Sequence, residues 1–136
     1  MNPRRAFVFP IALAISLILD QLTKRVAVAL LLGAPPLSLL DDFVIFALVP
    51  NRGGFMSLGG GLPDPWRTWI FSVLVPLALL AVCVWLVRDA GSTRRMLLGI
   101  GLVAGGGIGN WIDRLLQGAV VDFVSVGFGF LRTGYF

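Results

Sequence analysis

Residues 69 to 87 contain no charged side chain, and their one proline, Pro76, marks a candidate kink. A helix needs about 20 predominantly apolar residues to cross a bilayer, so this stretch is long enough to span one. Of all residues, 57% are hydrophobic and 13% are charged. A typical soluble domain has roughly 25% charged residues. The chain is therefore predicted to be a polytopic membrane protein.

The chain divides into five segments of different character. We expect a first helix over about 6–32, a second over about 66–88 and a third over about 96–114. Segment 33–65 holds most of the prolines and is expected to form a β-cradle with loops, while segment 118–136 is expected to be extended. The predicted fold is a single, mainly α-helical membrane domain with three transmembrane helices and a small extramembrane sheet.

Two short stretches predict the strands of this sheet. FVIFALV, residues 43 to 49, is rich in β-branched and aromatic residues and is bounded by turn formers. AVVDFVSV, residues 119 to 126, is extended and β-branched in the same way. Trp66 and Trp69 then mark an interface belt, so we expect the sheet to lie at the bilayer surface.

Glycine recurs every fourth residue in the third predicted helix, at Gly101, Gly105 and Gly109. Such a small-xxx-small pattern predicts that a second helix approaches this face closely. A phosphate-binding glycine loop is the weaker interpretation, because no strand precedes the glycines and no Gly-Lys-Ser/Thr follows them.

The net charge of +4 comes from ten arginines and Lys24 against seven aspartates. The arginines lie singly or in pairs between apolar stretches, which is typical of span ends that contact anionic lipids and not of a nucleic-acid partner. Arg4 and Arg5 would share one side of a three-span bundle with the arginines of RDAGSTRR, and the other basic residues would lie on or near the opposite side. The count of basic residues therefore does not decide the orientation, whereas their clustering favours a cytoplasmic N-terminus.

The residue types that are missing narrow the chemistry. The chain has no histidine and no glutamate, which excludes Ser-His-Asp triads and histidine zinc sites. We expect neither a metal nor a cofactor. Its one cysteine, Cys83, lies within LLAVCVWLV and is interpreted as a buried apolar residue.

Several polar residues have a structural interpretation. Asp20 and Lys24 are four residues apart and are predicted to form an ion pair on one helix face. Asn110, Asp113 and Arg114 project from the end of the third helix. In the structural interpretation Asp113 pairs with Arg114, and Asn110 forms a hydrogen bond to another helix.

Asp122 is different, because it has no basic neighbour in the sequence. It is flanked by valine and phenylalanine near the bilayer. Desolvation in such surroundings would raise the pKa of its carboxyl group, which makes Asp122 a candidate general acid or base.

Four motifs, LDQLTK, NRGGF, GGGIGNWIDR and GAVVDF, occur in this order along the chain. Together they resemble the bacterial lipoprotein signal peptidases (signal peptidase II) over nearly the whole chain. The resemblance implies a four-helix aspartic endopeptidase of the inner membrane, with a β-cradle and an active site toward the periplasmic face. It also implies a substrate class, namely prolipoproteins that carry a diacylglyceryl-modified cysteine.

Within these motifs, Asp122 matches the first catalytic aspartate of the family. Seven further polar residues are assigned, four to the active site and substrate and three to structural positions. The first group is Asn51, Gly53, Asn110 and Arg114, and the second is Asp20, Lys24 and Asp113.

An aspartic peptidase needs a second carboxylate that shares a proton with the first. In the family, a Phe-Asn-x-Ala-Asp motif supplies it and begins the fourth helix, and Phe136 matches the first letter of that motif. We therefore expect the second catalytic aspartate to be absent from these 136 residues and the activity of the chain to be impaired. Asp113 is expected to stay passive, because Arg114 beside it would keep it ionised.

Two alternatives remain open at this stage. One is a non-catalytic membrane protein that keeps the same architecture and packs against lipids or a partner. The other is a Ser–Lys hydrolase that uses Lys24 with Ser16 or Ser125. The second is disfavoured because Asp20 would keep Lys24 protonated, and a protonated lysine cannot act as a general base.

Overall fold

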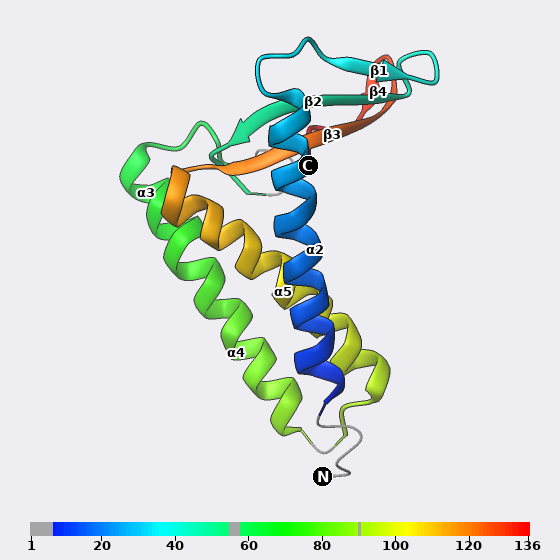
Figure 1. Cartoon of the computed structure of the whole chain (residues 1–136). Helices are drawn as coiled ribbons and strands as arrows, with labels where there is room; N and C mark the ends of the chain where they lie inside the picture. The colour runs from blue at the N-terminus through cyan, green and yellow to red at the C-terminus, as the bar shows by residue number, and fades with distance from the viewer. Residues whose placement is uncertain (1–6, 55–57, 90) are drawn as a thin grey trace.

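The computed structural model describes residues 7–54, 58–89 and 91–136; Arg4 and Arg5 lie outside this part of the chain. Helix α5 (Arg94–Gln117) packs against both α2 (Val8–Leu31) and α4 (Val75–Arg88). Figure 1 shows a four-stranded sheet at one end of these helices. The structure confirms the prediction of a mainly helical protein with a small antiparallel sheet.

The sheet has the order β1-β2-β3-β4, and all of its neighbouring strands are antiparallel. Its strands are β1 (Leu37–Leu39), β2 (Val44–Asn51), β3 (Val120–Phe128) and β4 (Leu131–Arg132). The two central strands, β2 and β3, lie where the β-branched stretches predicted strands.

The central strand β3 follows helix α5 after a short turn. The helix begins after Thr93, whose hydroxyl accepts a hydrogen bond from the main-chain N–H of Met96 at 3.2 Å. It ends at Gly118, which has a φ of +72° and donates its N–H to the carbonyl of Arg114 at 3.0 Å. Glycine adopts this left-handed conformation without strain, so it reverses the chain into β3 at low cost.

The predicted glycine stripe is the contact surface between α5 and α2. A Cβ atom on Gly101 would lie 2.8 Å from the Cβ of Ala12, and one on Gly105 would lie 2.5 Å from the carbonyl oxygen of Leu13. One on Gly109 would overlap the carboxylate of Asp20. The three glycines therefore let α2 approach the α5 backbone, as the small-xxx-small pattern predicted.

We expect Gly105→Ala to lower the free energy of unfolding by about 1–3 kcal/mol, the usual cost of overpacking. The added methyl group would meet the backbone of Leu13 and the Cβ of Ser16 at 2.6 Å, and the helices would have to separate. Gly99→Ala is the matched control, because a Cβ at Gly99 meets nothing within 4 Å. Alanine there should stabilise α5 by roughly 1 kcal/mol. Thermal unfolding of both variants in detergent measures the difference, and equal effects would contradict the packing argument.

The helix that contains Pro76 continues through the proline. It runs from α3 (Asp64–Thr68) through the π-helical turn η2 (Trp69–Leu74) into α4. Pro76 has no N–H to donate to the carbonyl of Ser72 four residues earlier. That carbonyl instead accepts the indole N–H of Trp111 from α5 at 2.9 Å. The indole of Trp111 thus links α5 to the π-helical turn that precedes Pro76.

Two described helical stretches, Asp64–Arg88 and Arg94–Gln117, are long and apolar enough to cross a bilayer. Helix α2 is also long, but Asp20, Lys24 and Arg25 interrupt its apolar sequence, so the third span stays a prediction. The outer faces of the helices expose large apolar side chains, as lipid-facing helices do. Examples are Ile15, Ile18 and Leu22 on α2, Leu77, Leu80 and Trp85 on α4, and Leu102 and Val103 on α5.

Candidate active site

Asp122 lies on β3 opposite the last residues of β2. A bulge inserts one extra residue into β2, since Phe46 pairs with Val124 and Val49 pairs with Asp122. The register then brings Asn51, the last residue of β2, next to Asp122. The Asn51 and Asp122 side chains come from segments 71 residues apart and are 5% and 7% exposed.

The side-chain amide of Asn51 holds both the carboxylate and the turn that follows β2. Its Nδ2 donates to Oδ2 of Asp122 at 2.7 Å and to the carbonyl of Gly54 at 2.9 Å. Its Oδ1 accepts the main-chain N–H of Gly53 at 2.8 Å, which makes an Asx-type turn. Because the oxygen is used by Gly53, the amide nitrogen faces Asp122.

Arg114 supports the same turn from α5. Its Nη2 donates to the carbonyl oxygen of Gly53 at 2.6 Å, and its guanidinium lies 5.6 Å from the ring centre of Phe71. The Phe71 ring packs closely against Gly54. A Cβ atom added to Gly54 would lie 2.6 Å from the ring. The structure therefore brings together Asn51, Gly53, Arg114 and Asp122.

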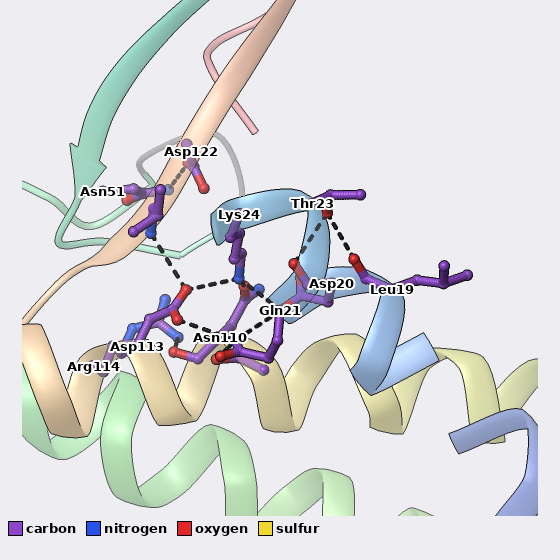
Figure 2. Close-up of polar contacts among 12 residues, drawn as sticks. Leu19, Asp20, Gln21, Thr23, Lys24, Asn51, Asn110, Asp113, Arg114 and Asp122 are labelled. Carbon is purple, nitrogen blue, oxygen red and sulfur yellow. Dashed lines mark hydrogen bonds and ion pairs between the residues drawn. The ribbon is translucent and has the colours of Figure 1, made fainter. Parts of the chain in front are cut away.

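Lys24 is the centre of a second polar cluster, between α2 and α5 (Figure 2). The side chain is buried, and its Nζ lies 2.9 Å from Oδ2 of Asp20 and 2.7 Å from Oδ2 of Asp113. It also donates to Oδ1 of Asn110 at 2.7 Å. The predicted Asp20–Lys24 pair is confirmed, as is the hydrogen bond of Asn110 to another helix.

The predicted pairing of Asp113 with Arg114 is wrong. Neighbouring residues on a helix point about 100° apart and do not face each other. Asp113 therefore faces Lys24 on α2, whereas Arg114 faces the turn at Gly53. It is Lys24 that holds Asp113 in place, and this partner lies 89 positions away in the sequence.

Sequence reasoning missed Gln21, which also binds Asp113. Its Nε2 donates to Oδ1 of Asp113 at 3.2 Å and to the carbonyl of Gly109 at 3.3 Å. Its spacing of three residues from Lys24, which puts both on one face of α2, is the signal that could have found it. The main-chain N–H of Val121 donates to Oδ2 of Asp113 at 3.4 Å, which links this cluster to the strand of Asp122.

The geometry does not assemble a Ser–Lys dyad. The Nζ atom of Lys24 contacts oxygen atoms of Asp20, Asp113 and Asn110, and neither serine hydroxyl is among these partners. The hydroxyl of Ser16 donates to the carbonyl of Leu102 at 2.8 Å, and that of Ser125 donates to the carbonyl of Thr133 at 2.9 Å.

Burial raises the pKa of the Asp122 carboxyl group above its usual range, as its surroundings in the sequence predicted. The hydrogen bond from Asn51 and the positive charges of Lys24 and Arg114 oppose this increase, and the negative charge of Asp113 adds to it. A desolvated carboxyl group with nearby charges of both signs is suited to taking up and releasing a proton.

An apolar groove of about 970 Å³ runs along α4 and α5 to this site. Its walls include Leu79, Leu80 and Val84, together with Cys83, which is buried as predicted. At the end nearest the sheet the lining becomes polar, with Gly54, Asn110 and Arg114. Among the described residues, no group of three carboxylate or thiol side chains could hold a metal ion.

The chain is similar to known bacterial peptidases. The family model described as "Signal peptidase (SPase) II" matches residues 12–136. A "Lipoprotein signal peptidase" of Rhodococcus jostii (strain RHA1) is 40% identical over 134 residues, which cover 93% of this chain and 63% of the relative. One of Burkholderia pseudomallei (strain K96243) is 39% identical over 119 residues, which cover 83% of this chain and 68% of the relative. The chain therefore spans about two thirds of the length of these relatives.

Two solved structures have the same fold, and both are described as bacterial membrane enzymes determined by the in meso method. The first has a TM-score of 0.71 and 24% identity, and the match covers 92% of this chain and 74% of that one. The second has a TM-score of 0.67 and 24% identity, and the match covers 92% and 79% of the two chains.

Proposed function

Because the chain belongs to the signal peptidase II family, we propose that it is a membrane aspartic endopeptidase that removes signal peptides from bacterial lipoprotein precursors. Its substrates are prolipoproteins that carry a diacylglyceryl-modified cysteine. The observation that carries the proposal is the buried carboxyl group of Asp122, held by Asn51 beside the end of an apolar groove. Burial raises its pKa, and a raised pKa favours proton transfer by a carboxyl group.

The proposal includes three transmembrane helices in the inner membrane, with the sheet on the periplasmic side. Helix α2 has 24 residues and a length of roughly 36 Å at 1.5 Å per residue, against a hydrocarbon core of about 30 Å. Its Asp20 and Lys24 neutralise each other and face α5. Charged side chains are tolerated within a membrane when they face the bundle interior in this way, which supports α2 as the third span.

In the proposed reaction Asp122 shares one proton with a second carboxylate. One carboxylate acts as a base on the attacking water, and the other protonates the carbonyl oxygen or the leaving nitrogen. Asp113 is poorly suited to be that partner, because Lys24, Gln21 and the N–H of Val121 already occupy its oxygens. The chain spans about two thirds of its relatives' length, and we propose that the second carboxylate belongs to the part that it does not span.

The main chain around Phe136 is compatible with this assignment. Its N–H donates to the carbonyl of Val124 at 2.9 Å, and its carbonyl accepts the N–H of Val124 and that of Phe123 at 3.0 Å. A segment attached after Phe136 would therefore begin beside the strand that carries Asp122. The 136-residue chain is expected to cleave substrate far more slowly than a chain continued through the second aspartate, in an assay of precursor processing. Equal rates for the two chains would contradict the two-carboxylate mechanism.

The apolar groove suits the hydrophobic part of a signal peptide. Apolar side chains line it along α4 and α5, whereas Asn110 and Arg114 lie at the end near Asp122. A helical signal peptide bound there would bring its polar cleavage region toward the turn at Gly53. The four supporting residues, Asn51, Gly53, Asn110 and Arg114, then hold the turn and the substrate while Asp122 takes part in the chemistry.

The function is tested by incubating the protein, continued through the second aspartate, with a lipid-modified precursor in detergent. We expect the mature lipoprotein and the free signal peptide as products, separated by gel electrophoresis. The same precursor without the diacylglyceryl group is the matched substrate control and should stay uncut. If the modified precursor is cleaved no faster with the protein than without it, the alternative of a non-catalytic membrane protein with the same architecture is favoured.

Replacing Asn51 with alanine should change the pH dependence of cleavage. The amide of Asn51 lowers the pKa of Asp122, so its loss should raise that pKa further and shift the acidic limb of the kcat/KM profile to higher pH. We expect the maximal rate to fall by about tenfold or more, as for the loss of a hydrogen bond to a charged group. Ser38→Ala, on β1 of the same sheet, is the control. A lower rate with an unmoved acidic limb would mean that Asn51 acts only on the turn.

A further inference from the structure

A separate polar pocket of about 260 Å³ lies beside the apolar groove, and Phe71, Ser72 and Arg114 line both. Its charged lining residues are three arginines and one aspartate, Arg52, Arg67, Arg114 and Asp64. Its other polar lining residues are Thr68, Ser72 and Gln117. The charged side chains thus leave an excess of two positive charges, which favours an anionic ligand.

The pocket lies where two helices that can cross a bilayer begin and end. Asp64 is the first residue of the stretch Asp64–Arg88, and Gln117 is the last residue of α5. Figure 1 shows the start of α3 next to the C-terminal end of α5, at the end of the molecule that carries the sheet. The side chains of Trp66 and Trp69 are 66% and 64% exposed, and such tryptophans are typical of the headgroup level of a membrane.

The three arginines differ in how many of their donors are already used. Arg67 is fixed by an ion pair with Asp64 and by hydrogen bonds to the carbonyls of Gly60 and Leu62. Arg114 donates to two carbonyls, and its Nε has no partner among the described residues. Arg52 is exposed and makes no hydrogen bond or ion pair with another described residue. The Nε atom of Arg114 is buried, so the pocket combines the fixed guanidinium group of Arg67 with the exposed guanidinium group of Arg52, whose N–H donors remain available to a ligand.

We propose that this pocket binds the phosphate group of an anionic phospholipid headgroup. Guanidinium groups match the geometry of phosphate oxygens and form charge-assisted hydrogen bonds with them. The small polar volume suits a headgroup and not acyl chains, which would lie against the exposed apolar side chains of the neighbouring helices. Since Arg114 also holds the carbonyl of Gly53, a bound headgroup would rest on a residue that supports the turn next to Asp122.

The proposal is tested by lipid binding to the purified protein in detergent, followed by native mass spectrometry. Phosphatidylglycerol should bind, phosphatidylethanolamine should bind more weakly, and Arg52→Gln should weaken phosphatidylglycerol binding by about tenfold, as for one charge-assisted hydrogen bond. Arg52→Lys keeps the charge and should restore part of the affinity. The matched control is Arg95→Gln, which removes an exposed arginine at the opposite end of α5 and should leave binding unchanged.

Equal weakening by Arg52→Gln and Arg95→Gln would overturn the proposal, because it would indicate attraction to net charge alone. Equal affinity for the two lipids would do the same. Glycerol phosphate without acyl chains distinguishes a free phosphate ligand from a lipid, and binding as tight as that of phosphatidylglycerol would overturn the lipid assignment. Binding should persist in Asp122→Asn, so this proposal and the proposed peptidase function can fail independently.

Discussion

Asp122→Asn is expected to reduce precursor cleavage by about 10²–10⁴-fold, the range for the loss of a general acid or base. Asparagine has nearly the same shape, and its side-chain oxygen can still accept the hydrogen bond that Asn51 donates to Asp122. What it removes is the ionisable carboxyl group that the proposed mechanism requires. The rate is measured by processing of a lipid-modified precursor, in a chain that also carries the second aspartate.

The same substitution should leave the protein at least as stable as the wild type near pH 7. Burial raises the pKa of Asp122 in the folded state, so the folded protein binds this proton more tightly than the unfolded chain does. The contribution of Asp122 to stability is therefore greatest below the unfolded pKa of about 4 and falls as the pH rises through the folded pKa. The Tm of Asp122→Asn minus that of the wild type should be near zero at low pH and should increase toward neutral pH.

Asp89→Asn is the matched control for both measurements, because Asp89 follows α4 at the end of the helices away from the sheet. It should change neither the cleavage rate nor the pH dependence of Tm. A loss of cleavage in Asp122→Asn together with a lower Tm at every pH would mean that Asp122 stabilises the fold. Normal cleavage in Asp122→Asn would refute its catalytic role.

Lys24→Met should destabilise the protein by about 3–5 kcal/mol, the usual result of removing one partner from a buried ion pair. Lys24 lies within 3 Å of carboxylate oxygens of both Asp20 and Asp113, and its side chain is buried. Without it, two carboxylates would face each other between α2 and α5 with no counter-charge. Thermal unfolding in detergent should show a decrease in Tm of about 10 °C or more.

Arg25→Met is the matched control, since it removes the same charge from the next residue of α2 but at an exposed position. Surface substitutions of this kind usually change stability by no more than about 0.5 kcal/mol. A second variant, Lys24→Met with Asp113→Asn, should recover part of the lost stability because it removes one of the stranded charges. If Lys24→Met and Arg25→Met lower Tm equally, the cluster around Lys24 does not hold α2 to α5.

Much of the fold follows from patterns that are local in the sequence. The apolar stretch at 69–87 predicted a membrane-spanning helix. The bilayer core offers no water to the backbone N–H and C=O groups, and a helix satisfies these groups within its own segment. The glycines at 101, 105 and 109 predicted a close helix contact, which α2 makes. The β-branched stretches at 43–49 and 119–126 predicted the two central strands.

The candidate site was visible from the sequence only in part. Asp122 is conspicuous as a carboxylate among apolar residues, and NRGGF marks the turn that contains Asn51 and Gly53. Their hydrogen bond depends on the register between β2 and β3, and one inserted residue in β2 sets that register. A one-residue shift would turn Asn51 to the other face of the sheet, so no local pattern could have shown that it meets Asp122.

The partner of Asp113 was likewise decided by the tertiary structure. Sequence alone determined the membrane class, the three long helices, the two central strands, and which polar side chains need partners, because each of these depends on the composition of a short segment. It could not determine which charges meet, because Lys24 and Asp113 lie on different helices and come together only when α2 packs on the glycines of α5. Ion pairs and hydrogen bonds act over a few ångströms, and distances on that scale between remote segments exist only once the helices and the sheet are packed.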